Sequence, residues 1–257
     1  MVYSQVIDML SGAARPYSIV DGEYPSIISY PYNVEYAKLI IDELQELGVR
    51  FIVTDGSVNM NGYRVVGKGC SSIVLKGIYR DSVVAVKILR SDSSRQSVEH
   101  EASMLKLVNR AGIGPRFITN SRHVLVMEYL HGEVIGKWLI HTSTQDGIDG
   151  MKRVLGCLLE QCYTLDSMGV DHGELSNMYR HVIVTGDYAH IIDFEGSSTK
   201  RSVKNLTSAV QYLFLSPNSS IHVNTKDKEL LVYMLREYKR NINKISFDRI
   251  VRVLGIY

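Results

Sequence analysis

Residues 171–195 read DHGELSNMYRHVIVTGDYAHIIDFE. The pattern predicts an irregular acidic loop and then two short apolar strands, Val182–Thr185 and Ala189–Ile192, joined by a tight Gly-Asp turn. Such a hairpin can bring the carboxylate of Glu174 in the loop to that of Asp193 after the second strand. Phosphoryl transfer needs such a pair, one carboxylate to orient the attacking hydroxyl and one to hold Mg²⁺. Taken singly, Asp193 is also typical of a turn that ends a strand.

A glycine-containing loop, GKGCSSIV at residues 67–74, stands between two predicted strands. Gly67 and Gly69 would let backbone amides approach a phosphate, because no Cβ intervenes. Ser72 stands where a G-x-G-x-x-G loop has its third glycine. Taken by itself, the loop favours an ordinary tight turn.

Lys87 ends the run Val-Ala-Val-Lys in an otherwise apolar predicted strand. A lysine there either lies on an exposed face or has an anionic partner in a cleft. Glu101 supplies that partner, since it lies beside the apolar stripe of a helix predicted over residues 94–110. We therefore expect an ion pair between Lys87 and Glu101, with Glu99, further round the helix, as the alternative.

The chain divides into three predicted regions. Residues 1–60 form an N-terminal extension with one helix, capped by Asn33 and ended by Gly48, and a short strand. Residues 61–128 are strand-rich with one helix, and residues 129–257 are mostly helical. This succession predicts an α+β fold of two lobes with a small α+β extension at the N-terminus.

The amino-acid composition excludes several classes of protein, among them disordered, membrane-spanning and disulfide-rich proteins. The 257 residues are 45% hydrophobic and 22% charged, which excludes wholesale disorder. No apolar run approaches the roughly 18 residues of a membrane-spanning helix, and the N-terminus lacks the pattern of a secretory signal, so we expect a cytoplasmic protein. Three cysteines without C-x-x-C spacing argue against a disulfide framework and a zinc site. A net charge of +2 is too small to indicate a nucleic-acid binder.

The order of these motifs is more specific than any one of them. From about Tyr63 to Phe214, glycine loop, strand lysine, helix glutamate, His-x-acid loop, hairpin and Asp-Phe resemble the protein kinase superfamily. The chain looks most like small archaeal Ser/Thr kinase-like proteins near the RIO kinases and the KEOPS-complex kinase. The resemblance implies a kinase-like fold with a reduced C-lobe, ATP as substrate, and Mg²⁺ or Mn²⁺ as cofactor.

The resemblance also implies roles for individual residues. Glu174 takes the place of the catalytic aspartate, with His172 holding its loop, and Asp193 takes the place of the main metal ligand. Lys87 would bind the ATP phosphates while paired with Glu101. The remaining nucleotide contacts would come from the glycine loop and from the segment whose backbone binds adenine: Gly67, Gly69, Ser72 and Val74, and Glu128, Tyr129 and Leu130.

The chain departs from the kinase pattern in the loop that carries Glu174 and in the segment that follows Asp193. The catalytic acid would be Glu174, whose side chain is one methylene group longer than that of aspartate. Tyr179 stands where kinases have their second metal ligand, an asparagine, so that either Asn177, two residues early, or His181, in the strand register, would replace it. Alternatively, His181 packs against the loop or hydrogen-bonds to it, and only Asp193 and phosphate oxygens hold the metal ion. Glu195 replaces the glycine after Asp-Phe. No Ala-Pro-Glu segment follows, and a typical peptide-binding platform is not expected.

Three functions fit this pattern: phosphorylation of protein Ser/Thr, with the chain itself as a candidate first substrate; a nucleotide-binding scaffold or ATPase that acts through a partner; and phosphorylation of a small molecule. The protein substrate cannot be named from the sequence. Residues 226–252 carry eight Lys or Arg against four acidic residues. The resemblance to RIO and KEOPS kinases implies that this run could face an RNA-containing assembly, but a charged, solvated helix surface is the explanation that the pattern favours.

Overall fold

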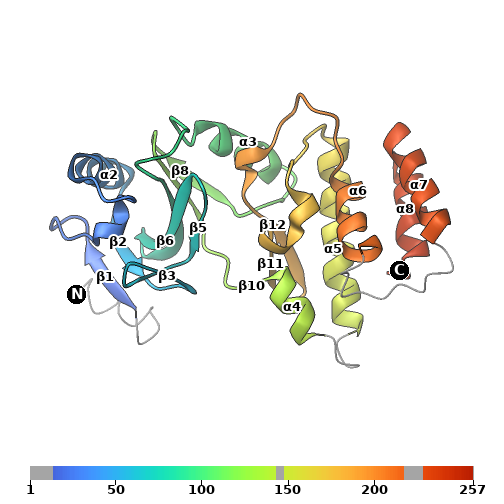
Figure 1. The fold of residues 1–257 in the computed structure, drawn as a ribbon, viewed down its shortest axis with the longest axis horizontal. Helices are drawn as coiled ribbons and strands as arrows, with labels where there is room; N and C mark the ends of the chain where they lie inside the picture. The colour runs from blue at the N-terminus through green and yellow to red at the C-terminus, as the bar shows by residue number, and fades with distance from the viewer. Residues whose placement is uncertain (1–13, 143–147, 217–227, 257) are drawn as a thin grey trace. The chain divides into compact units, whose positions relative to one another are not determined.

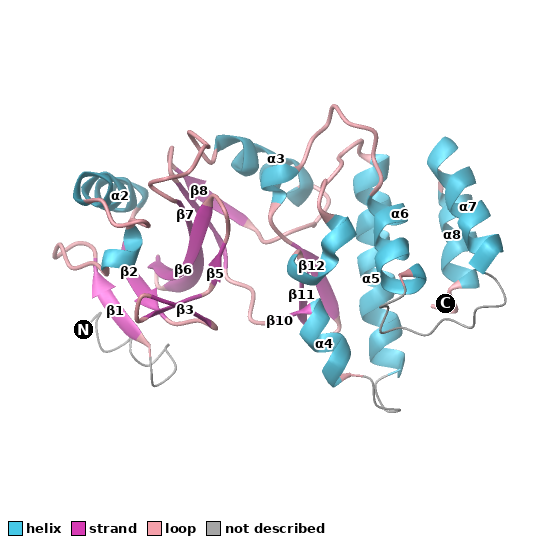
Figure 2. Cartoon of the chain, in the orientation of Figure 1, coloured by secondary structure: helices cyan, strands magenta, loops and turns pink. Residues whose placement is uncertain are grey.

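The computed structural model describes residues 14–142, 148–216 and 228–256. The chain forms two compact units. The N-terminal unit comprises residues 1–106 and 116–129, and the C-terminal unit comprises residues 107–115 and 130–257. Strands dominate the first unit and helices the second (Figure 2). The predicted α+β class is thus confirmed.

The N-terminal unit is built on one antiparallel sheet in the order β1-β2-β6-β7-β9-β8, with β5 paired to β6. Its strands are β1 (Arg15–Ser18), β2 (Val49–Thr54), β5 (Gly67–Lys68), β6 (Ser72–Tyr79), β7 (Ser82–Leu89), β8 (Phe117–Asn120) and β9 (Val124–Glu128). A separate hairpin joins β3 (Val58–Met60) to β4 (Tyr63–Val65), and a short 3₁₀ turn covers Ser26–Ile28. Strands β1 and β2 belong to the N-terminal extension, so the extension completes this sheet.

Helix α2 (Val34–Leu47) packs on one face of the sheet (Figure 1). The Asn33 side chain accepts a hydrogen bond from the backbone N–H of Tyr36 at 2.9 Å, and Gly48 ends the helix with φ of 81°. Both ends lie where the sequence predicts them. The helix buries its apolar stripe in a core of which the following residues are part: Ile40, Leu44, Ile52, Leu75, Val84, Val86, Ile88, Val124 and Val126.

A buried carboxylate fastens α2 to the turn between β8 and β9. Glu43 accepts hydrogen bonds from the Ser121 hydroxyl and from the backbone N–H of His123, and one carboxylate oxygen lies 2.6 Å from His123 Nδ1. Because a buried charge needs such partners, the helix is held in one place on the sheet.

Helix α3 spans Glu99–Asn109 and begins five residues later than predicted. The preceding segment is irregular instead, because the Val98 N–H donates to Arg122 O at 2.9 Å and the Arg95 N–H to Ser93 Oγ at 3.1 Å.

The C-terminal unit packs helices around a small antiparallel sheet, β10-β11-β12. Its strands are β10 (Glu133–Val134), β11 (Val182–Thr185) and β12 (Tyr188–Ile191). Its helices are α4 (Ile135–His141), α5 (Ile148–Ser167), α6 (Asn205–Val210), α7 (Lys228–Arg240) and α8 (Lys244–Val253), with 3₁₀ turns η3 (Leu175–Arg180) and η4 (Phe194–Gly196) and the π-helical turn η5 (Gln211–Leu215). Within the described residues, no helix is both long and apolar enough to cross a membrane.

One buried acid joins three helices of this unit. Asp166, near the end of α5, accepts hydrogen bonds from the backbone and side-chain amides of Asn205 in α6 at 2.9 and 2.8 Å. It also accepts from Leu206 N–H at 3.1 Å and from the Tyr238 hydroxyl in α7 at 2.9 Å. Burial raises the pKa of Asp166, and these four donors oppose that shift by stabilising its charged form.

The basic run at residues 226–252 lies mainly on α7 and α8, while Lys226 falls outside the described residues. Part of its charge is neutralised locally, since Arg240 pairs with Glu237 at 2.7 Å and Lys244 with Asp248 at 2.8 Å.

Candidate active site

Lys87 lies on the face of the sheet opposite α2. It is in register with Val74 on β6 and Leu125 on β9, and residues directly opposite in an antiparallel sheet point to the same face. Its neighbours Val86 and Ile88 belong to the core under α2, so the lysine points the other way.

The ion pair between Lys87 and Glu101 is present, as the sequence predicts. Lys87 Nζ lies 2.7 Å from Glu101 Oε2 and 2.8 Å from Oε1, and the two side chains are 6% and 5% exposed. Glu99, the alternative, is exposed. A buried pair of this kind is a poor route to stability, because both charges must be desolvated. Its presence is better explained if the ammonium group also serves an anionic ligand.

The glycine loop is the turn of a hairpin. Gly67 on β5 pairs with Val74 on β6, and Gly69 N–H donates to the carbonyl of the buried Ser72 at 2.8 Å. Neither glycine has a positive φ. A Cβ on Gly67 would approach nothing closer than 3.9 Å. The fold therefore does not require glycine at position 67, and a turn alone does not explain it.

The segment aligned with the adenine-binding backbone leaves the sheet at the end of β9. Glu128 exchanges hydrogen bonds with Arg116, its backbone N–H donating to Arg116 O at 2.9 Å and its carboxylate accepting from Arg116 N–H at 3.0 Å. Lys76 Nζ lies 4.7 Å from the ring centroid of Tyr129. Leu130 is the first residue of this stretch in the C-terminal unit.

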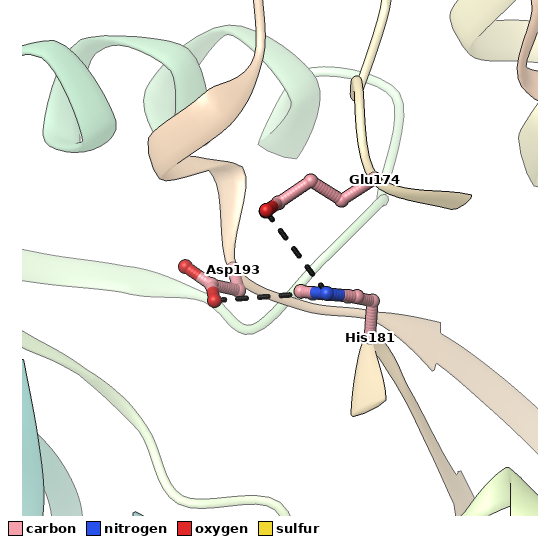
Figure 3. Close-up of side chains that lie close together, drawn as sticks. All are labelled: Glu174, His181 and Asp193. Carbon is pink, nitrogen blue, oxygen red and sulfur yellow. Dashed lines mark ion pairs between the residues drawn. The ribbon is translucent and has the colours of Figure 1, made fainter. Parts of the chain in front are cut away.

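Three side chains of the C-terminal unit converge (Figure 3). His181 Nε2 lies 4.0 Å from Glu174 Oε2, and His181 Nδ1 lies 3.8 Å from Asp193 Oδ2. One ligand atom from each residue lies within 4.8 Å of the others. The hairpin thus does what the sequence analysis expects of it, since it brings the carboxylates of Glu174 and Asp193 to one place.

The donors of this cluster suit a divalent cation. The two carboxylates offer hard oxygens, and His181 Nδ1 is buried without a hydrogen-bond partner in the described structure. A buried nitrogen without a partner is costly unless something else binds it. Asn177, the other possible second ligand, is exposed in η3, and its backbone N–H donates to Glu174 O at 2.9 Å.

The backbone at Asp193 is strained. Its φ of 67° and ψ of 71° lie in the left-handed region, which residues other than glycine rarely adopt. Strain of this kind persists only where the surroundings enforce it, and it concentrates at functional sites. The next residue, Phe194, is buried and anchors the segment.

His172 is fully buried beneath the cluster. Its Nε2–H donates to Ile192 O at 3.0 Å, and its Nδ1 lies 3.4 Å from the Glu174 N–H. Its ring meets those of His181 and Phe194 edge to face. Burial lowers the pKa of His172 to about 4, so the ring is neutral near pH 7. His172 therefore orients the loop and the two neighbouring residues, and is placed too deep to meet a substrate.

Comparison with known proteins identifies the family. The model of the RIO domain matches residues 76–208, just over half of the chain. The chain belongs to the RIO-domain family. RIO domains form an atypical family of protein kinases, so the predicted resemblance is confirmed. The matched range includes Lys87, Glu101, Glu174 and Asp193, whereas the glycine loop at residues 67–74 precedes it.

Two relatives share parts of this RIO protein. The uncharacterized protein MJ1211 of Methanocaldococcus jannaschii is 31% identical over 90 residues, which are 34% of this chain and 72% of that protein. The probable serine/threonine-protein kinase gdt2 of Dictyostelium discoideum is 28% identical over 114 residues, which are 43% of this chain and 7% of that protein.

Two residues that support the RIO site were not predicted. Asn205 Oδ1 accepts from the His172 N–H at 2.9 Å, and Arg201 Nε lies 3.0 Å from the buried carboxylate of Asp171. Asp171 is a second carboxylate of the same loop, and its burial against Arg201 gives it a structural role. These contacts join residues about thirty positions apart and leave no local signal. The sequence offers one indirect sign of the role of Asn205. Asp166 is an acidic residue next to the apolar stripe of α5, and its carboxylate accepts a hydrogen bond from Asn205.

Proposed function

We propose that this chain transfers the γ-phosphoryl group of ATP to a serine or threonine hydroxyl of a protein, with its own hydroxyls as the first substrates to examine. One observation carries the proposal: the carboxylates of Glu174 and Asp193, from segments on either side of a hairpin, lie within 4.0 Å of the same His181 ring. Phosphoryl transfer requires two such carboxylates, one that orients the attacking hydroxyl and one that binds the metal ion.

Glu174 is assigned to the attacking hydroxyl. Its side chain is 49% exposed, so a substrate can reach it, while its backbone is fixed by His172 Nδ1 and by the Asn177 N–H. A carboxylate within hydrogen-bond reach of the hydroxyl orients it and accepts its proton as the new bond forms. The longer side chain of glutamate is accommodated beside Gly196, where a Cβ would come within 3.4 Å of the Glu174 carboxyl carbon.

Asp193 and His181 are assigned to a divalent metal ion. When bound, the metal would neutralise charge on the phosphate oxygens of ATP. Asp193 supplies a carboxylate oxygen and is 38% exposed, and His181 supplies a buried ring nitrogen, which favours Mn²⁺ over Mg²⁺. Glu174 lies near enough to be a third ligand in the resting state.

Lys87 is assigned to the phosphates of ATP, with Glu101 fixing its ammonium group. Gly67, Gly69, Ser72 and Val74 are assigned to the loop over the phosphates. Residues 128–130 are assigned to the adenine. The open space at Gly67 and the burial of the Lys87–Glu101 pair support these assignments.

Purified protein incubated with γ-labelled ATP and either Mg²⁺ or Mn²⁺ tests the proposal through its products. Label on the chain or on an added protein is the expected result. Release of labelled phosphate alone would replace the proposal with an ATPase that signals to a partner. Label on a metabolite but on no protein would replace it with a small-molecule phosphotransferase.

A further inference from the structure

A pocket of about 440 Å³ opens in the C-terminal unit, where η3, α6, η5 and α7 meet. It is distinct from the Glu174–His181–Asp193 cluster, none of whose members lines it. The side chains that matter for its chemistry are Ser176, Lys204, Thr207, Gln211, Tyr212 and Lys239.

The pocket is positively charged. None of the described residues that line it is acidic, whereas Lys204 and Lys239 reach it from two different elements. Neither ammonium group has an ion-pair or hydrogen-bond partner among the described residues, in contrast to the neutralised Arg240 and Lys244 nearby. Two lysines that line one hollow and have no ion-pair partner among the described residues attract an anion.

Three other lining side chains carry hydrogen-bonding groups without a structural task in the described residues. Ser176 and Ser208 carry hydroxyls, and Gln211 carries a carboxamide, for which the described structure shows no partner. Gln211 and Tyr212 belong to the π-helical turn η5. Such turns are rare and frequently mark functional sites, because they displace side chains from the regular helical positions.

The loop that carries Glu174 forms one wall. Ser176 lies in η3 two residues after Glu174, and the next residue, Asn177, donates its backbone N–H to Glu174 O at 2.9 Å. A ligand held in the pocket therefore contacts the same short segment that positions the catalytic acid.

We propose that this pocket binds a phosphate monoester group of the substrate, so that the enzyme acts on a substrate that already carries a phosphate. That this ligand is a substrate rests on the proposed function, whereas the binding of a phosphate group in the pocket does not. A phosphate monoester carries a charge of about −1.5 to −2 at pH 7, which matches two ammonium groups, and its oxygens accept from hydroxyl and carboxamide donors. Both lysines line the same hollow, which favours one such group over the extended groove that tracks a nucleic-acid backbone.

The test measures binding of inorganic phosphate and of phosphoserine to the full chain at constant ionic strength without added metal, by amide NMR shifts. The expected result is saturable shifts around residues 204–212 and Lys239 with both probes. Lys204→Ala and Lys239→Ala should each weaken binding about tenfold, as expected for one lost charged contact. Lys228→Ala is the matched control, since it removes an exposed lysine of α7 that does not line the pocket, and it should bind like the wild type.

Each other outcome overturns the proposal. Shifts at these residues that both lysine substitutions leave unchanged would mean an adventitious ion only. The pocket would be a nucleic-acid contact if the chain responded to neither probe and bound a single-stranded oligonucleotide instead. In that case both lysine variants would lose the binding of the oligonucleotide. The proposed function is judged separately, because phosphate binding here does not depend on Glu174, and loss of transfer in Glu174→Gln does not depend on this pocket.

Discussion

Lys87 Nζ lies 2.7 Å from Glu101 Oε2 in an ion pair whose members are both almost inaccessible to water. The pair joins strand β7 to helix α3 on the face of the sheet opposite α2. A buried pair that served stability alone could be replaced by apolar residues at little cost. This provides a way to separate its structural role from its proposed role in nucleotide binding.

Lys87→Ala or Glu101→Gln should each lower the free energy of unfolding by about 3 kcal/mol, because the surviving buried charge loses its partner in this ion pair. The double variant Lys87→Met with Glu101→Leu should recover most of that loss. ATP affinity should fall about tenfold or more in all three. Lys87, the proposed charged contact to phosphate, is removed in two of them and loses the carboxylate that fixes it in Glu101→Gln. Denaturant unfolding and calorimetric titration measure the two effects, with exposed Lys106→Ala on α3 as control. A stable double variant that binds ATP like the wild type would make the pair purely structural.

The glycine loop offers a matched pair of substitutions. Gly67→Ala should change the free energy of unfolding by less than about 0.5 kcal/mol, because its Cβ would meet nothing closer than 3.9 Å. ATP affinity should nevertheless fall about tenfold if the phosphates approach the backbone there. Gly77→Ala should do the opposite, since its Cβ would lie 2.6 Å from Val86 Cγ2 and overpacking costs about 2 kcal/mol. If Gly67→Ala binds ATP like the wild type, the loop is an ordinary hairpin turn and does not contact the phosphates.

His181 predicts the metal preference. With a ring nitrogen as second ligand, phosphoryl transfer should be faster with Mn²⁺ than with Mg²⁺. His181→Asn supplies an amide oxygen at the same position, and the preference should shift towards Mg²⁺. Asp193→Asn should abolish transfer with either ion. A Mn²⁺ preference that survives in both His181→Asn and His181→Ala would exclude His181 as its cause.

Asp166 predicts a stability effect remote from the chemistry. Asp166→Ala should lower the free energy of unfolding by about 3 kcal/mol, because four donors from α6 and α7 lose a buried acceptor. Tyr238→Phe removes only one of these hydrogen bonds and should cost about 1 kcal/mol. Equal losses in the two variants would show that the carboxylate is not the common acceptor. Thermal and denaturant unfolding provide the measurement.

The sequence predicts those parts of the fold that local chemistry determines. Helix α2 begins and ends at Asn33 and Gly48 because an asparagine cap and a left-handed glycine are local signals. Strand β1 was missed because Arg15–Ser18 has no apolar alternation and contains Pro16, which a strand tolerates at an edge. It becomes a strand only by pairing with β2.

The candidate site divides in the same way. The order of motifs was sufficient to pair Lys87 with Glu101 and to bring Glu174 towards Asp193. Whether Asn177 or His181 accompanies Asp193 depends on how η3 turns before β11, which spacing alone does not determine. The strained backbone of Asp193 and the support of His172 by Asn205 are likewise tertiary effects.

The most direct test of the account is the rate of phosphoryl transfer from ATP in Glu174→Gln relative to the wild type, measured alongside the ATP affinity of each. Glutamine keeps the size of the side chain but cannot accept the proton of the hydroxyl. The account predicts that transfer falls by about 10²-fold or more while ATP affinity changes little. Asp171→Asn, at the buried acid paired with Arg201, is the control for damage to the loop. Transfer by Glu174→Gln at the wild-type rate would contradict the central claim.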